Sequence, residues 1–254
     1  MDYLNVAEAR ELPGLRIVLT ASVPGPWGEA LKSILDYKDL GYVAVEQLAG
    51  EENAELQAWT GQNSAPVALY EQEAPRVSWL DQLYLAERLA PRRPLLPADL
   101  EERALVIGLS RELAGELGLG WNRRLQLLGL TMLTDKAPPG IARMAHKYGW
   151  SEAEHARCGQ RINDCLNYFS SRLRTQQAVQ SRYLVGFDVS AADMYLVNFL
   201  GMLQPLKHDL NPMPGYMRQA YEYVAEDTAA AMDPILFEYR DEMYQKHLKT
   251  PLDF

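Results

Sequence analysis

The sequence predicts a two-part protein, with an α/β part over residues 1–90 and an all-helical part over residues 99–254. Three observations support this prediction. Strand and helix patterns alternate up to about residue 90, three prolines fall within the stretch 91–97, and only helical patterns follow. The proline-rich stretch 91–98 between the two parts is therefore predicted to be a linker.

The α/β part has the pattern strand, helix, strand, followed by a third strand, a turn and a helix. Strands are expected at residues 15–20, 42–48 and 66–70, and helices at residues 27–41 and 78–90. The turn after the third strand leaves room for a short fourth strand. A strand, a crossover helix and a parallel strand, followed by a hairpin and a covering helix, make a small α/β unit.

The second part contains a succession of helical patterns. They cover residues 99–117, 122–133, 151–179, 190–203, 215–232 and 234–248. Residues 191–203 are apolar around almost the whole helix circumference, which is typical of a helix at the centre of a bundle. Ser190 and Asp193 have the spacing of a capping box, which satisfies the first N–H groups of such a buried helix. We therefore predict that Asp193 begins this helix and has no catalytic role.

Composition and charge exclude several classes of protein. The chain has 254 residues and a formal net charge of -9, without the basic face that nucleic-acid binding requires. It lacks a leader pattern and any run of about 18 apolar residues, so a cytoplasmic protein without a membrane partner is expected. Cys158 and Cys165 lie about 10 Å apart on one predicted helix. This separation is too long for a disulfide, and the four histidines show no metal-ligand spacing.

Four segments resemble the cytosolic glutathione S-transferase superfamily. They are "PWGEALKSILDYKDLGY" at the first helix, "NSAPVALY" at the third strand, "VSWLDQLYLAERL" at the helix after it, and "RYLVGFDVSAADMYLVNFL" at the capping box. The resemblance covers essentially the whole chain, and the motifs come in the family's order. It implies a thioredoxin-like N-terminal domain followed by the all-helical glutathione-transferase domain, and a homodimer.

The resemblance also implies glutathione as the co-substrate and a set of residues that bind it. These are Trp27, Asn63, Ala65, Pro66 and Ser78, with Gln62 as a second candidate beside Asn63. In the family, the bond before the proline is cis, and the serine holds the γ-glutamyl carboxylate at a helix N-terminus. Val77 stands where the family has an acidic residue that contacts the ligand's amino group, so this contact is missing.

Ser22 is the candidate catalytic residue that the resemblance implies. The family places a Ser, Tyr or Cys after the first strand, where it hydrogen-bonds the glutathione sulfur and favours the thiolate. In the loop "TASVPGPWGEA", Ser22 is the best-placed hydroxyl, with Thr20 behind it. The alternative, that Ser22 only ends a strand or caps a turn, remains open. No cysteine lies in this loop, which excludes thiol–disulfide exchange there.

Two functions follow from these residues. The first is a glutathione transferase that adds the glutathione thiolate to a small hydrophobic electrophile. The second is a non-catalytic member of the fold that binds apolar ligands or a protein partner. Ser78 and the "SAP" segment favour the enzyme. Val77, and Gly25, which offers no side-chain group before Pro26, favour the binding protein.

Overall fold

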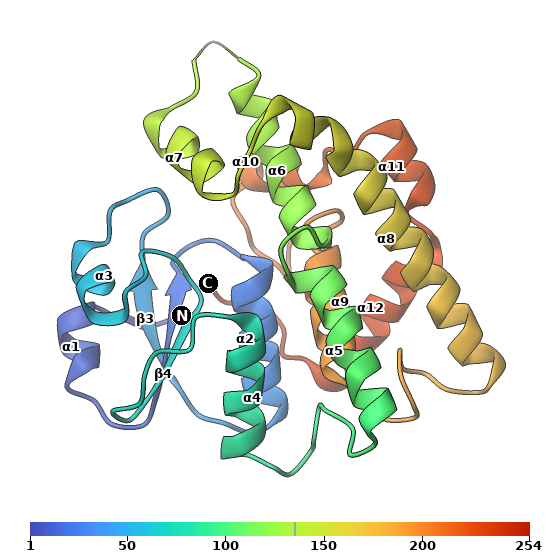
Figure 1. Ribbon diagram of the computed structural model, residues 1–254, viewed down its shortest axis with the longest axis horizontal. Coiled ribbons are helices and arrows are strands. Elements are labelled where there is room, and N and C mark those ends of the chain that lie inside the picture. The colour runs from blue at the N-terminus through green and yellow to red at the C-terminus, as the bar shows by residue number, and fades with distance from the viewer. Residues whose placement is uncertain (135) are drawn as a thin grey trace. The chain divides into compact units, whose positions relative to one another are not determined.

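The computed structural model describes residues 1–134 and 136–254, and these divide into two compact units (Figure 1). The N-terminal unit consists of Met1–Pro94 with two later segments, Lys207–Met213 and His247–Phe254. The helical unit consists of Leu95–Leu206 and Pro214–Lys246. Within the described part of the chain, none of the helices combines the length and apolar character needed to cross a bilayer.

The N-terminal unit is built on a four-stranded mixed sheet with the strand order β1-β3-β2-β4. Its elements are β1 (Tyr3–Leu4), α1 (Val6–Arg10), β2 (Leu15–Thr20), α2 (Pro26–Tyr37), β3 (Val43–Gln47), α3 (Ala54–Thr60), β4 (Val67–Tyr70) and α4 (Trp79–Leu89). Strands β1 and β2 run parallel to β3, and β4 runs antiparallel to β2. The predicted strands and helices of this part are confirmed, as is the parallel β2–α2–β3 crossover. After the turn that follows β4, where the sequence left room for a short fourth strand, the structure has only a single antiparallel bridge between Ala68 and Arg76 within the described residues.

The sheet is covered on both faces. Helices α1 and α3 lie over one face (Figure 1), where Val18, Val45 and Val67 pack against Val6 and Leu56. On the other face lie α2 and α4, which pack against each other. Because successive side chains point to opposite faces of a sheet, strands buried on both faces are apolar on both. This holds for the middle of β2 (Ile17–Leu19) and the start of β4 (Val67–Leu69), which are buried.

Three short elements of this unit escaped the sequence analysis, namely β1, α1 and α3. Helix α1 begins with a capping box in which the Asn5 side chain accepts from the Glu8 N–H at 2.9 Å. Helix α3 ends at Gly61, whose φ of +73° suits a residue without a Cβ. Each has seven or fewer residues, too few to show a helical or strand period.

The two later segments of the N-terminal unit differ from the predicted division at residues 91–98. The sequence analysis assigned all of residues 99–254 to the helical part, but Lys207–Met213 and His247–Phe254 group with the N-terminal unit. The Lys249 ammonium lies 2.7 Å from the Asp36 carboxylate on α2, and the Leu252 N–H donates to the Leu210 carbonyl at 2.8 Å. These contacts between residues distant in sequence leave no local signal.

The described elements of the helical unit are all helices. They are α5 (Leu100–Ala114), α6 (Leu119–Met132), α7 (Pro139–Lys147), α8 (Glu152–Ala178), α9 (Ala191–Leu200), α10 (Gly215–Glu222), α11 (Glu226–Ala231) and α12 (Pro234–His247). The predicted all-helical part is confirmed. Helix α7 was not predicted, and the single helix expected over 215–232 is in fact two, α10 and α11.

A buried arginine explains why the helix expected over 215–232 is broken. The Arg123 guanidinium on α6 donates to the carbonyl of Tyr221 at 3.0 Å and to that of Tyr223 at 2.6 Å. It also donates to the Met202 carbonyl just beyond α9, at 3.0 Å. Carbonyl groups at the end of α10 are therefore satisfied by a side chain from another helix, and the chain can turn there. Burial lowers the pKa of Arg123 to about 10.

Helix α9 is buried over its whole length, as predicted, and Asp193 lies in its first turn. The Asp193 carboxylate accepts from the Ser190 N–H and hydroxyl, both at 2.7 Å, from the Leu184 N–H at 2.8 Å and from the Tyr239 hydroxyl at 2.6 Å. Burial raises the pKa of this carboxyl, although the hydrogen bonds act in the opposite direction. The predicted structural role of Asp193 is confirmed, and Tyr239 on α12 is a partner that the sequence does not reveal.

Replacing Asp193 should destabilise the helical unit far more than an equivalent surface change. In Asp193→Asn, an amide N–H₂ faces the Ser190 or Leu184 donors, and buried donors left unpaired cost about 1–3 kcal/mol each. Tyr239→Phe removes one hydrogen bond and should cost about 1 kcal/mol. Chemical denaturation measures both changes, with the exposed Asp188→Asn as control. Equal stability of Asp193→Asn and Asp188→Asn would refute the role of this network.

Candidate functional site

The candidate site lies at the edge of the sheet where β2 and β3 end and β4 begins. Thr20, the last residue of β2, pairs with Gln47, the last residue of β3, and Val18 pairs with Val67 at the start of β4. The turn that contains Ser22 and the segment that contains Ala65 and Pro66 therefore leave the sheet at the same edge. Ligands of α/β sheets bind at such edges, outside the carboxyl ends of parallel strands.

Ser22 lies in the turn between β2 and α2 with its side chain exposed. Its φ of +60° is in the left-handed region. Its hydroxyl makes no hydrogen bond to any residue in the described part of the chain. The Thr20 hydroxyl, by contrast, donates to the Gln47 side-chain oxygen at 2.7 Å. Ser22 is thus the hydroxyl of this turn that faces solvent, and Thr20 is engaged in the structure.

Helix α2 begins directly after this turn and has no side-chain cap among the described residues. Gly25 is the N-cap residue and Pro26 the first helical residue. Glycine at this position contributes no side-chain acceptor, and the N-terminal end of a helix attracts negative charge. Trp27, one of the residues that the resemblance implied, follows as the second residue of the helix and is half-buried.

The segment before β4 contains the cis peptide bond between Ala65 and Pro66 that the resemblance implied. Two buried glutamine side chains hold it from either side. The Gln82 amide on α4 donates to the Pro66 carbonyl at 2.9 Å, and the Gln47 amide donates to the Asn63 carbonyl at 3.3 Å. Asn63 is exposed, and Ala65 is half-buried. The structure therefore brings Asn63, Ala65 and Pro66 to the same edge as Ser22.

Ser78 is the N-cap residue of α4, and its hydroxyl already has a partner. It accepts from the Asp81 N–H at 3.1 Å and donates to the Asp81 carboxylate at 2.7 Å. Because Gln82, on the same turn of α4, bonds to Pro66, the start of α4 lies beside the cis-proline segment. A ligand carboxylate at Ser78 would therefore meet the negative charge of Asp81. Val77, in place of the family's acidic residue, is 46% exposed.

Three residues of this edge were missed by the sequence analysis. Asp81 could have been found, because Ser78-x-x-Asp81 repeats the pattern that identified Asp193. Gln47 and Gln82 carry no sequence signal, since a glutamine near the end of a strand or in the first turns of a helix is usually exposed. Their burial, with 6% and 3% of each residue exposed, appears only in the fold.

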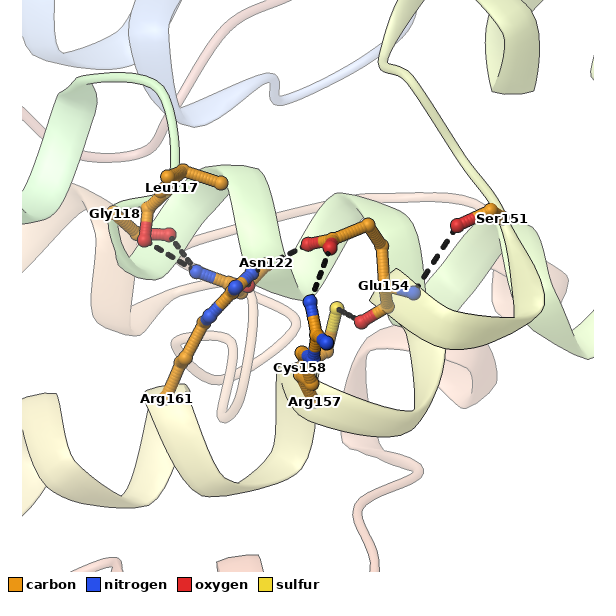
Figure 2. Close-up of polar contacts among 8 residues, drawn as sticks. All are labelled: Leu117, Gly118, Asn122, Ser151, Glu154, Arg157, Cys158 and Arg161. Atoms are coloured by element: carbon orange, nitrogen blue, oxygen red, sulfur yellow. Dashed lines mark hydrogen bonds and ion pairs between the residues drawn. The ribbon is translucent and has the colours of Figure 1, made fainter.

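Cys158 takes part in a structural network of the helical unit (Figure 2), whereas the Cys165 thiol donates to the Glu112 carbonyl at 3.7 Å. The Cys158 thiol donates to the Glu154 carbonyl at 3.2 Å, and the Glu154 carboxylate pairs with Arg157 at 2.9 Å and with Arg161 at 2.8 Å. Burial raises the pKa of Cys158 to about 11 and that of Cys165 to about 12. In the described residues, no three His, Cys, Asp or Glu side chains gather closely enough to hold a metal ion.

Both cysteines should react slowly with iodoacetamide in the native protein. The thiolate is the reactive form, and a pKa of about 11 leaves roughly one thiol in a thousand ionised at pH 8. Mass spectrometry should show labelling of Cys158 and Cys165 only after denaturation. Labelling of the native protein at the rate of the unfolded chain would contradict the burial described above.

The whole fold is that of known proteins, although the sequence is distant from them. No protein-family model and no curated protein matches the chain. A glutathione transferase family member from Pseudomonas fluorescens, solved with two glutathione bound, superposes with a TM-score of 0.63 at 14% identity, covering 92% of this chain and 89% of that chain. A glutathione S-transferase from Methylobacterium radiotolerans, in complex with glutathione sulfonate, gives 0.60 at 16% identity over 91% of both chains.

A plant protein matches equally well. Rice GST1 in complex with glutathione has a TM-score of 0.59 at 17% identity, covering 95% of this chain and 94% of that chain. The agreement extends over nearly the full length of each protein. The chain therefore has the glutathione S-transferase fold, a thioredoxin-like unit followed by an all-helical unit.

Proposed function

We propose that the N-terminal unit binds glutathione along the edge formed by Ser22, Ala65–Pro66 and the start of α4. The observation that carries this proposal is that the Ala65–Pro66 segment and the uncapped N-terminus of α2 both lie at the edge of the sheet where β2 ends and β4 begins. The Ala65 backbone makes no hydrogen bond to any residue that the structure describes. An extended peptide can pair with such a backbone as an added strand does. Of the similar structures named above, two contain glutathione and one contains glutathione sulfonate.

We further propose that bound glutathione is ionised at this edge and added to a small hydrophobic electrophile. A thiol with a pKa near 8.5 is mostly protonated at neutral pH, so it needs a stabilised thiolate to react. The exposed Ser22 hydroxyl can donate a hydrogen bond to the sulfur, and the N-terminus of α2 adds a favourable dipole. With an aryl halide, the bond between sulfur and the electrophilic carbon forms as the carbon–halogen bond breaks. The halide ion leaves, and the thiol proton goes to solvent.

Removing the Ser22 hydroxyl should lower turnover about tenfold, the effect of one pKa unit on the bound thiol. Two variants separate the hydroxyl from the backbone. Ser22→Gly keeps the left-handed conformation without strain, whereas Ser22→Ala imposes some. Both should lose activity with a generic aryl halide and still bind glutathione by calorimetry. Full activity of Ser22→Gly would show that the hydroxyl has no catalytic role.

Calorimetric titration with reduced glutathione tests the binding site itself. Ser78→Ala removes the hydroxyl at the start of α4 and should weaken micromolar to low-millimolar binding. Loss of the N-cap costs about 1 kcal/mol of stability, so the variant is assayed well below its unfolding transition. No heat from the unchanged protein up to about 10 mM glutathione would refute the proposal.

The bond between Ser78 and Asp81 favours a second candidate function, a binding protein of this fold that does not use glutathione. The exposed Asp81 carboxylate occupies the Ser78 hydroxyl and places a negative charge where the ligand's carboxylate would bind. Val77 gives no compensating contact to the ligand's amino group. In this alternative, the start of α4 is simply a capped helix end.

Asp81→Asn distinguishes the two functions. The amide can still bond to Ser78 but carries no charge. If glutathione places its γ-glutamyl carboxylate at the start of α4, removing a like charge should tighten binding severalfold, because exposed charge pairs contribute up to about 1 kcal/mol. In the alternative, the titration with glutathione does not change. The exposed Asp188→Asn is the control for the loss of one negative charge.

A further inference from the structure

The side chain of Gln47 connects the two segments that form the candidate edge. Its oxygen accepts from the Thr20 hydroxyl at 2.7 Å, at the end of β2. Its nitrogen donates to the carbonyls of Leu48 and Asn63, at 2.8 and 3.3 Å. Both hydrogens and one lone pair of the amide are therefore used, with only 6% of the residue exposed. The Gln47 backbone carbonyl also accepts from the Ala21 N–H at 3.0 Å.

These hydrogen bonds connect the turn that contains Ser22 with the segment that contains Ala65, the two segments proposed to bind glutathione. Ala21 precedes Ser22 directly, and Asn63 lies two residues before Ala65. Gln82 holds the same segment from the other side, but its contacts are to Pro66 and Arg76 and do not reach the Ser22 turn. Gln47 is thus the side chain whose hydrogen bonds join the thiol end of the site to its peptide-pairing segment.

The engagement of Thr20 has a second effect. Because the Thr20 hydroxyl donates its hydrogen bond to Gln47, it does not compete with Ser22 as a donor to the ligand sulfur. The Gln47 amide also donates to the Asn63 carbonyl, which an apolar side chain at position 47 could not do. The requirement for an amide at position 47 thus arises from two polar groups, the Thr20 hydroxyl and the Asn63 carbonyl, that belong to two different segments.

We infer that Gln47 is a positioning residue, which sets the distance between the Ser22 hydroxyl and the Ala65 backbone. The inference rests on the proposed function, because those two groups hold the sulfur and the cysteinyl backbone of the same ligand. A shift of either segment would spoil both contacts together, since the ligand is one short peptide.

Gln47→Met tests this inference, because it keeps the side-chain length and removes the three side-chain hydrogen bonds while the backbone bond to Ala21 remains. We expect about tenfold weaker binding of glutathione. We also expect a higher pKa of the bound thiol, which the ultraviolet absorbance of the thiolate measures as the pH is varied. The matched control is Gln176→Met in the helical unit. Gln176 is also a buried glutamine, and its amide bonds to the Tyr183 and Gly186 carbonyls. The control should lose similar stability without either change.

Thr20→Val is a second variant for the case in which Gln47→Met does not fold. It removes one of the three side-chain bonds of Gln47 and should shift binding in the same direction by a smaller factor. Unchanged affinity and unchanged pH dependence in a folded Gln47→Met or Thr20→Val protein would overturn the inference.

Hydrogen exchange separates this inference from the proposed function. In Gln47→Met, the amides of residues 21–23, 25 and 62–65 should exchange faster together, whereas in Gln176→Met they should not. If the unchanged protein binds no glutathione, the proposed function fails, and this paired change still decides whether Gln47 couples the two segments. Unchanged exchange in both segments would overturn the inference whatever the binding result.

Discussion

The buried carboxylate of Asp193 is the interaction on which the helical unit depends. Helix α9 has all ten of its residues buried, so water cannot satisfy its first N–H groups or those of the loop before it. Asp193 receives four hydrogen bonds, from the loop at Leu184, from the N-cap residue Ser190 and from Tyr239 on α12. One side chain therefore begins the central helix, holds the preceding loop and attaches the last long helix. A buried carboxylate is tolerated only with such partners, because its desolvation is costly.

The N-terminal unit uses neutral amides for a similar purpose. Gln47 and Gln82 are buried, and each connects carbonyl groups of two segments beside the cis Ala65–Pro66 bond. A neutral amide costs less to bury than a charge and offers donors that loop carbonyls need. The exposed residues of the edge, Ser22 and Asn63, thus stand on segments that buried groups hold in place. This arrangement suits a ligand site, which needs accessible groups in fixed positions.

The same four-residue pattern has different consequences at two places in this chain. Ser190-x-x-Asp193 is buried and organises a helix bundle, whereas Ser78-x-x-Asp81 begins α4 with the aspartate exposed at the candidate site. In both patterns the aspartate bonds to the serine hydroxyl at 2.7 Å. Asp193 also accepts from the Ser190 N–H, from Leu184 and from Tyr239, while Asp81 is exposed to solvent. At the proposed site, that exposed charge would repel an anionic ligand group at the start of α4.

The sequence by itself determined the two-part architecture, the longer helices and strands of the sheet, and the capping box of α9. These features follow from local periodicity and from residues a few positions apart, which act along one element. The resemblance to a known family implied the cis bond before Pro66, which no local pattern could indicate. Tertiary structure alone decided the burial of Gln47 and Gln82, the break between α10 and α11 at Arg123, and the return of residues 207–213 and 247–254 to the N-terminal unit. These depend on contacts between residues far apart in the chain, and a hydrogen bond from a distant side chain leaves no trace in the local pattern.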